Sequence, residues 1–279
     1  MQPVLLKDIY PCVALQEYVR KYQVFKFTFE RDTIPPVKFH APRPEHSITF
    51  YVRDLQKFSQ INSDTTTTYP PCVIKGLYTI PLYRYGGYDF WAIKVILQPT
   101  TLSRLKIIKV NELTNRFINA EDYFGKYVSL LCEQLMRMNE LKSMIPAIES
   151  FLIHLIAKRC KKAEPIDEAS NFILDQDGSR LLGGLASQSC LSTRQFIRKF
   201  EEKVGVSPKM FQKIIRFDKA FRLKNNQPGL DWLSIALACG YYDYQHLVKD
   251  FQAFTSLTPP AFYEIEKASP ERTFALHES

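Results

Sequence analysis

The sequence predicts an α+β protein with a β-rich first part and an all-helical last part. Within residues 25–118, segments alternate apolar and polar side chains and carry many aromatic and β-branched residues, as strands do. From about residue 120 the apolar residues change to a helical spacing, and the last hundred residues repeat one helical unit. A chain of 279 residues is long enough to form two domains.

The first domain is expected to span residues 1–160, with strands at about 25–118. Gly86 and Gly87 between aromatic runs predict a two-residue hairpin turn, which pairs Tyr85 with Tyr88 and Tyr83 with Phe90. These four aromatic residues are candidates for an effector pocket: Tyr83, Tyr85, Tyr88 and Phe90. Because strands favour aromatic residues in any case, a role in the core or the hairpin is the alternative.

Two helices are expected at about 120–160. Apolar residues recur at steps of three and four from Phe124 to Met138 and again from Ile148 to Leu155, with Pro146 in the first turn of the second helix. Such a pair packs within its own chain or forms the seam of a homodimer, and the sequence does not choose between them. A polar segment at 161–165 that ends in proline is the expected linker.

Several classes of site are disfavoured by composition. The six cysteines are widely spaced with no CxxC pair, which indicates reduced thiols in a cytoplasmic protein. His40 and His46 are six residues apart and form no HxH pair, so we expect no metal. We also expect no cofactor and no enzyme activity, since the chain lacks a Gly-rich phosphate loop and the GxSxG and HExxH signatures. The sequence contains no run of 18 apolar residues, so we expect no membrane-spanning helix.

The formal charge of +8 is concentrated in one stretch. Residues 179–224 hold 11 lysines and arginines against 3 acidic residues, so this window carries as much net charge as the whole chain. Residues 225–279 are acidic, with 3 basic and 7 acidic residues. A confined basic block favours a polyanionic partner, while a solvated helical face is the alternative.

The second domain is expected at 166–267, followed by a tail at 268–279, and it contains an internal repeat. At an offset of 51, like residues recur: Phe196 and Leu247, Arg198 and Lys249, Phe200 and Phe251, Pro208 and Pro259, Phe211 and Phe262. In each copy a cap, Ser192 or Asp243, opens a helix. A solenoid is the structural alternative, but it needs at least three repeats.

The capped helix of each copy has two unlike faces. Phe196 and Phe200 lie on the inner face, whereas Arg194 and Arg198 lie on the outer one. A helix that reads the DNA major groove needs this division, because arginine can bond guanine and glutamine suits adenine. The basic helix between the copies is about 27 Å long, so it could set the two reading helices about one DNA turn, roughly 34 Å, apart.

Several motifs in this domain resemble those of a known family. They are Leu-Ala at 185–186, S-x-R-x-F-x-R-x-F at 192–200, G-x-S-P-x-x-F at 205–211, R-x-x-x-A at 216–220, I-A-x-x-C-G-Y-x-D at 235–243 and T-P-x-x-F-Y at 258–263. Together they resemble the double helix-turn-helix domain of AraC/XylS-type bacterial transcription regulators over residues 165–265. The resemblance implies seven helices, two recognition helices in adjacent major grooves, and transcription regulation, usually activation through RNA polymerase.

The resemblance also implies candidate residues and partners. The DNA-binding candidates are Ser192, Thr193, Arg194, Ile197 and Arg198 in the first unit, Lys213 and Arg216 in the connecting helix, and Tyr244, Gln245, Val248 and Lys249 in the second unit. Double-stranded DNA is the expected partner, in the bacterial cytoplasm and on the nucleoid. Family members often carry an N-terminal cupin-like barrel that binds an effector and a helical pair that dimerises, and the order of elements here is similar.

Two residues depart from the family pattern. Ser256 stands where glycine is common, at a helix end that requires positive φ. Lys249 stands where arginine is frequent, and lysine lacks the bidentate fork. Because the second unit also lies in an acidic segment, we expect the first unit to dominate DNA affinity. Two other function classes stay in view: a small-molecule enzyme fused to a DNA-binding module, and an architectural DNA-binding protein.

Overall fold

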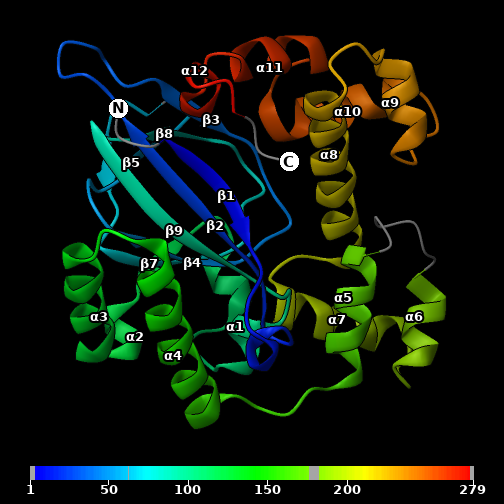
Figure 1. Cartoon of the computed structure of the whole chain (residues 1–279). Helices are drawn as coiled ribbons and strands as arrows, with labels where there is room; N and C mark the ends of the chain where they lie inside the picture. Colours follow the sequence, from blue (N-terminus) through cyan, green and yellow to red (C-terminus); the bar gives the residue numbers. More distant parts are fainter. Residues whose placement is uncertain (1–3, 62, 176–181, 277–279) are drawn as a thin grey trace.

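The computed structural model describes residues 4–61, 63–175 and 182–276 of the chain (Figure 1). Its first domain contains two antiparallel sheets. The six-stranded sheet has the order β1 (Leu5–Ile9), β2 (Val19–Thr28), β9 (Asp89–Leu97), β4 (Ser47–Tyr51), β7 (Cys72–Lys75) and β10 (Phe117–Asn119). The four-stranded sheet has the order β3 (Val37–His40), β8 (Leu82–Tyr85), β5 (Lys57–Gln60) and β6 (Thr67–Thr68).

Both faces of the six-stranded sheet are covered. One face shares an aromatic cluster with the four-stranded sheet, in which Phe27, Tyr51 and Phe58 are buried. The other face packs on helices α3 (Lys126–Arg137) and α4 (Leu141–Arg159), which lie against it in Figure 1. Short helices complete this domain: η1 (Val13–Leu15), α1 (Thr101–Arg104), η2 (Val110–Leu113) and α2 (Glu121–Phe124).

The hairpin predicted at Gly86 and Gly87 is wrong. Strand β8 pairs with β3 and β5, while β9 pairs with β2 and β4, so the two glycines join different sheets. The paired contacts expected between Tyr85 and Tyr88 and between Tyr83 and Phe90 are therefore absent from these ladders. Glycine is needed at position 87 because of a close approach instead: a Cβ there would lie 2.2 Å from a carboxylate oxygen of Asp54.

The two helices expected after the strands are present, but the second begins earlier than predicted. It starts at Leu141, so Pro146 lies inside α4 rather than in its first turn. Val128, Leu131, Ile148 and Leu152 are buried against the sheet, as the helical spacing predicted.

The second domain is helical and shows the predicted repeat. Its elements are α5 (Pro165–Asp175), α6 (Leu182–Gln188), α7 (Thr193–Val204), α8 (Pro208–Asn226), α9 (Trp232–Ala238), α10 (Tyr244–Thr255), α11 (Pro259–Glu266) and α12 (Pro270–Thr273). Helices α7 and α10 have 12 residues each and begin 51 positions apart. Figure 1 shows the two units, α6 with α7 and α9 with α10, at opposite ends of α8.

The two domains share part of one core. Phe39, Ala41 and Leu77 of the first domain belong to the same buried cluster as the helices of the second. The rings of Phe39 and Phe262 meet edge to face, with their centroids 5.9 Å apart. Within the part of the chain that the structure describes, no helix is long and apolar enough to cross a membrane.

Candidate nucleic-acid interface

The first reading helix, α7, is opened by a capping box. The Ser192 hydroxyl accepts from the Gln195 N–H at 3.3 Å, and the Gln195 side chain accepts from the Ser192 N–H at 3.0 Å. The cap predicted at Ser192 is thereby confirmed. Because the N–H groups of Ser192 and Gln195 are satisfied locally, the capping box stabilises the start of the helix.

The second reading helix, α10, is opened by an aspartate. Asp243 accepts from the His246 N–H at 2.8 Å, which confirms the second predicted cap. The same carboxylate lies 2.9 Å from the His246 ring. The cap therefore holds both the backbone and a side chain at the start of α10.

The two faces of these helices separate as the sequence predicted. Phe196, Phe200, Leu247 and Phe251 are fully buried. On the first helix Thr193, Arg194 and Arg198 are exposed and Ile197 is half-buried; on the second, Gln245 and Lys249 are exposed and Tyr244 and Val248 are half-buried. The side chain of Arg198 is 70% exposed and makes a long 3.8 Å contact with Glu202, so it can reorient towards a ligand.

The two reading helices end alike, in the left-handed region. Gly205 follows α7 with φ +89°, and Ser256 follows α10 at the equivalent place with φ +61°. The positive φ expected at Ser256 is thus confirmed. A serine in this conformation carries a steric cost that glycine avoids.

Three of the six basic residues of the connecting helix α8 hold the domain together. The Lys213 Nζ lies 2.9 Å from one oxygen of the buried Asp250, and Arg216 lies 3.7 Å from the other. Lys224 is buried and donates to the carbonyls of Pro228 and Leu230. The predicted DNA contacts Lys213 and Arg216 are therefore already engaged with α10, whereas Lys209 at the start of α8 is exposed.

The end of α7 is docked on the first domain. The Thr114 hydroxyl donates to the Gly205 carbonyl at 2.8 Å. A Cβ at position 205 would lie 2.8 Å from the Thr114 hydroxyl and 3.0 Å from the Val110 carbonyl oxygen. Glycine is required there both by the close approach and by the positive φ.

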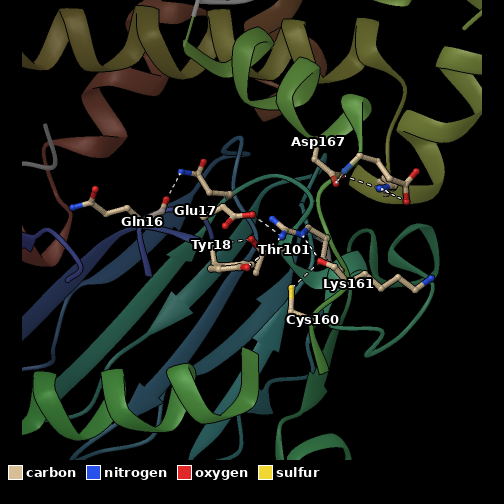
Figure 2. Close-up of polar contacts among 11 residues, drawn as sticks. Gln16, Glu17, Tyr18, Thr101, Cys160, Lys161 and Asp167 are labelled. Carbon is tan, nitrogen blue, oxygen red and sulfur yellow. Dashed lines mark hydrogen bonds and ion pairs between the residues drawn. The ribbon is translucent and has the colours of Figure 1, made fainter. Parts of the chain in front are cut away.

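The linker is tied to the first domain by Arg104. Its guanidinium bonds Glu17 at 2.6 Å and the Lys161 carbonyl at 3.1 Å. Figure 2 shows Glu17, Tyr18 and Thr101 gathered beside Cys160, at the end of the first domain, and Lys161, at the start of the linker. At the start of α5, Asp167 bonds Lys203 of α7 at 2.9 Å, so the linker is tied to the first domain at one end and to the first reading helix at the other.

A cavity in the first domain has apolar walls and cationic groups. Its walls include Phe25, Phe27 and Phe90, with a volume of about 70 Å³. Among the described residues, the charged side chains that line it are Lys38, Lys75, Arg84, Lys94 and Glu271. Cations therefore outnumber carboxylates around an apolar space.

Two of these cations, Lys75 and Arg84, have no carboxylate partner among the residues that the structure describes. The buried Lys75 Nζ donates to the Tyr51 hydroxyl at 2.8 Å and lies 3.9 Å from the centre of the Tyr69 ring. Burial and the nearby charges of Arg84 and Lys94 lower the pKa of Lys75 well below its usual value. The Nε of Arg84 and the hydroxyl of Thr49 are buried and have no hydrogen-bond partner in the described part of the chain. The site thus favours an anion.

Of the four aromatic residues predicted for an effector pocket, Phe90 lines this cavity. Tyr83 instead packs on Phe39 towards the helical domain, Tyr85 bonds Ser59, and Tyr88 is 41% exposed. The cationic residues were missed from the sequence. Lys75 and Lys94 interrupt otherwise apolar strands, and that interruption is the signal that could have identified them.

A family model described as a helix-turn-helix domain matches residues 185–264, which cover α6 to α11. The chain carries an AraC-type helix-turn-helix domain. An uncharacterised HTH-type transcriptional regulator of Haemophilus influenzae is 35% identical over 79 residues, 28% of this chain. The matched segment spans about a quarter (26%) of that relative's length.

Solved structures resemble a larger part of the chain at low identity. ToxT of Vibrio cholerae is 12% identical with a TM-score of 0.49, covering 88% of this chain and 97% of its own. ToxT bound to an unsaturated fatty acid has a TM-score of 0.47 at 11% identity, covering 92% and 97%. The AraC-like activator CuxR has a TM-score of 0.26 at 12% identity, covering 80% and 87%.

Proposed function

We propose that this protein is a sequence-specific DNA-binding transcription regulator that reads adjacent major grooves with α7 and α10. The observation that carries the proposal is the repeat of one capped helix, with the same length and the same division between a buried apolar face and an exposed polar face. Exposed Arg194 and Arg198 suit guanine, and exposed Gln245 suits adenine.

The spacing of the two units supports the same proposal. Helix α8 has 19 residues and is therefore about 28 Å long. With the bodies of the two units added, the reading helices can occupy major grooves about one turn, roughly 34 Å, apart. Such a protein would act where bacterial DNA lies, in the cytoplasm.

Selection of bound DNA from a random pool, at a stated salt concentration, tests this function. We expect an enriched motif with two parts separated by about one helical turn, 10–10.5 base pairs. The double variant Arg194→Ala and Arg198→Ala should lose the first part only, and Arg31→Ala, at an exposed position after β2, is the matched surface control. Binding without any enriched motif would instead identify an architectural protein. Transcription from the selected site with purified RNA polymerase then tests the polymerase as a partner.

We also propose that the cavity of the first domain binds a small anionic effector with an apolar part. Lys75, Arg84 and Thr49 offer buried donors to the anion, and Phe25 and Phe90 offer an apolar wall. Calorimetry with sodium decanoate, and with decanol as the uncharged control, tests this. We expect decanoate to bind and Lys75→Met to weaken its binding by about tenfold, since it removes one charge-assisted hydrogen bond. Equal binding of decanol would contradict the anionic site.

We propose further that the outer face of α3 and α4 forms a homodimer. Tyr127 and Leu130 are 72% and 60% exposed, and Ile153 on α4 is 42% exposed. A groove of about 430 Å³ runs between the two helices. A two-fold dimer would cover these apolar side chains and bring two pairs of reading helices to one DNA site. Sedimentation of wild type and Leu130→Glu tests this, with a dimer and a monomer as the expected results.

A further inference from the structure

The chain beyond the reading units returns to the first domain. The family match ends at residue 264, and the following segment contains the end of α11, the short helix α12 and residues up to 276. Figure 1 shows α12 beside β3, at the edge of the four-stranded sheet. We call residues 266–276 the clasp.

One end of the clasp is electrostatic. Glu266 and Glu271 are both buried and both bond the Nζ of Lys38 on β3; the Glu266 oxygen lies at 2.7 Å. Of the two carboxylates, Glu271 also lines the cavity. An anion inside the cavity would therefore meet Lys38 on the side where Glu271 now binds it.

The other end of the clasp is aromatic. Phe274 stacks on Phe27 with 5.8 Å between ring centroids and lies 5.3 Å from Phe29. Phe27 and Phe29 also line the cavity, so Phe274 packs on two rings that the apolar part of a ligand would contact. Arg272 bonds Asn225 of α8, which attaches the clasp to the helical domain as well.

The size of the cavity sets a condition on binding. About 70 Å³ holds a handful of water molecules, whereas pockets for drug-sized ligands are about 300–1,000 Å³. Since Pro270 and Glu271 form part of the wall, movement of the clasp is the direct way to enlarge the cavity.

Movement of the clasp would reach the second reading helix. Phe262 of α11 packs on Phe251 of α10 at 5.8 Å and on Phe39 of β3 at 5.9 Å. Helix α11 thus joins α10 to β3, and Glu266 at its end holds the same strand through Lys38.

We infer that the clasp is displaced by the effector: the ligand's anionic group competes with Glu271 for the cations that line the cavity, Lys38 among them, and its apolar part replaces Phe274 on Phe27. This loosens the second helix-turn-helix unit from the first domain and so changes DNA binding. The inference rests on the proposed anionic effector and adds the route by which that effector acts.

Decanoate binding to the full-length chain tests the sign of this relationship. If the clasp competes with the ligand, Glu271→Gln combined with Phe274→Ala should bind decanoate about tenfold more tightly than wild type, the gain expected from removing one competing charge-assisted contact. If the clasp is a fixed wall of the site, the same variant should bind more weakly, which would overturn the inference. Glu264→Gln, an exposed glutamate on α11, is the matched control and should leave affinity unchanged.

Hydrogen exchange and DNA binding give independent readings. Decanoate should speed exchange of amides in 266–276 of wild type, and slower exchange would contradict displacement. Decanoate should also shift the affinity of wild type for the selected DNA. It should leave the DNA affinity of the Glu271→Gln and Phe274→Ala double variant unchanged. Equal decanoate affinity of wild type and double variant would overturn the clasp alone, whereas binding to neither would overturn the effector site as well. The DNA selection described above does not depend on either outcome.

Discussion

Lys213 on α8 and Asp250 on α10 form an ion pair with 2.9 Å between the Lys213 Nζ and a carboxylate oxygen. The pair joins the connecting helix to the second reading helix. Asp250 is buried, and Arg216 lies 3.7 Å from its other carboxylate oxygen. Part of the basic block at residues 179–224 therefore stabilises the fold.

Loss of the Lys213 charge should destabilise the fold. We expect Lys213→Met to lower the free energy of unfolding by about 1–2 kcal/mol. The buried Asp250 loses the shorter of these two ion pairs and keeps the contact with Arg216 at 3.7 Å. Urea denaturation measures this. The control is Lys209→Met at the exposed start of the same helix, expected within about 0.5 kcal/mol of wild type. Similar losses in both variants would show that the ion pair contributes little.

The two units should contribute unequally to DNA affinity. Arg198→Ala is expected to cost about 1–3 kcal/mol, the range of a bidentate arginine contact to guanine, and Lys249→Ala less. Both side chains are exposed at equivalent positions, so the comparison is matched. Gel-shift titration on the selected DNA measures it, and equal losses would count against a dominant first unit.

The helix ends at 205 and 256 make a matched pair for stability. Ser256→Gly should raise the free energy of unfolding by about 1 kcal/mol, because glycine carries no penalty at φ +61°. Gly205→Ala should lower the free energy of unfolding by at least about 1 kcal/mol. The new Cβ would contact the Thr114 hydroxyl, and alanine is strained at the φ of +89° that this position requires. Thermal unfolding of both variants checks this, and a destabilised Ser256→Gly would contradict it.

Stability should fall in mild acid through His46. Its ring is buried, contacts the Pro99 carbonyl at 3.1 Å, and burial lowers its pKa to about 4. The unfolded chain takes up this proton near pH 6.5 but the folded chain does not, so stability is lost as pH falls from about 6.5 towards 4. Between pH 7 and 5 the loss from this group is about 2 kcal/mol.

Chemical denaturation at a series of pH values checks this prediction. The variant His46→Asn keeps an N–H donor for the Pro99 carbonyl and removes the titrating ring. It should show a smaller loss of stability between pH 7 and pH 5. An unchanged slope would assign the effect to other groups, such as buried His40, whose pKa is also lowered well below its usual value, first by burial and then by the nearby charge of Arg84.

The local features of the helical domain could be predicted because they depend on residues close in sequence. The caps at Ser192 and Asp243 and the repeat offset of 51 follow from spacing and side-chain chemistry. The positive φ at Ser256 was likewise expected and is present.

Long-range features could not be predicted in the same way. Gly86 and Gly87 looked like a hairpin because local pattern does not reveal that β8 and β9 belong to different sheets. The contact between Lys38 and Glu266 joins residues 228 positions apart. The ion pairing of Lys213 also depends on tertiary packing, so its availability for DNA was overestimated from charge alone.

The shared core has a consequence for dividing this chain. Phe39, Ala41 and Leu77 complete the packing of the helical domain. A cut within the linker would therefore expose an apolar patch on each of the two fragments. An isolated DNA-binding fragment would need polar substitutions on the surface around Phe262 to avoid aggregation. A chimera that joins this domain to another sensor domain would have to include strand β3, which carries Phe39, together with the helices.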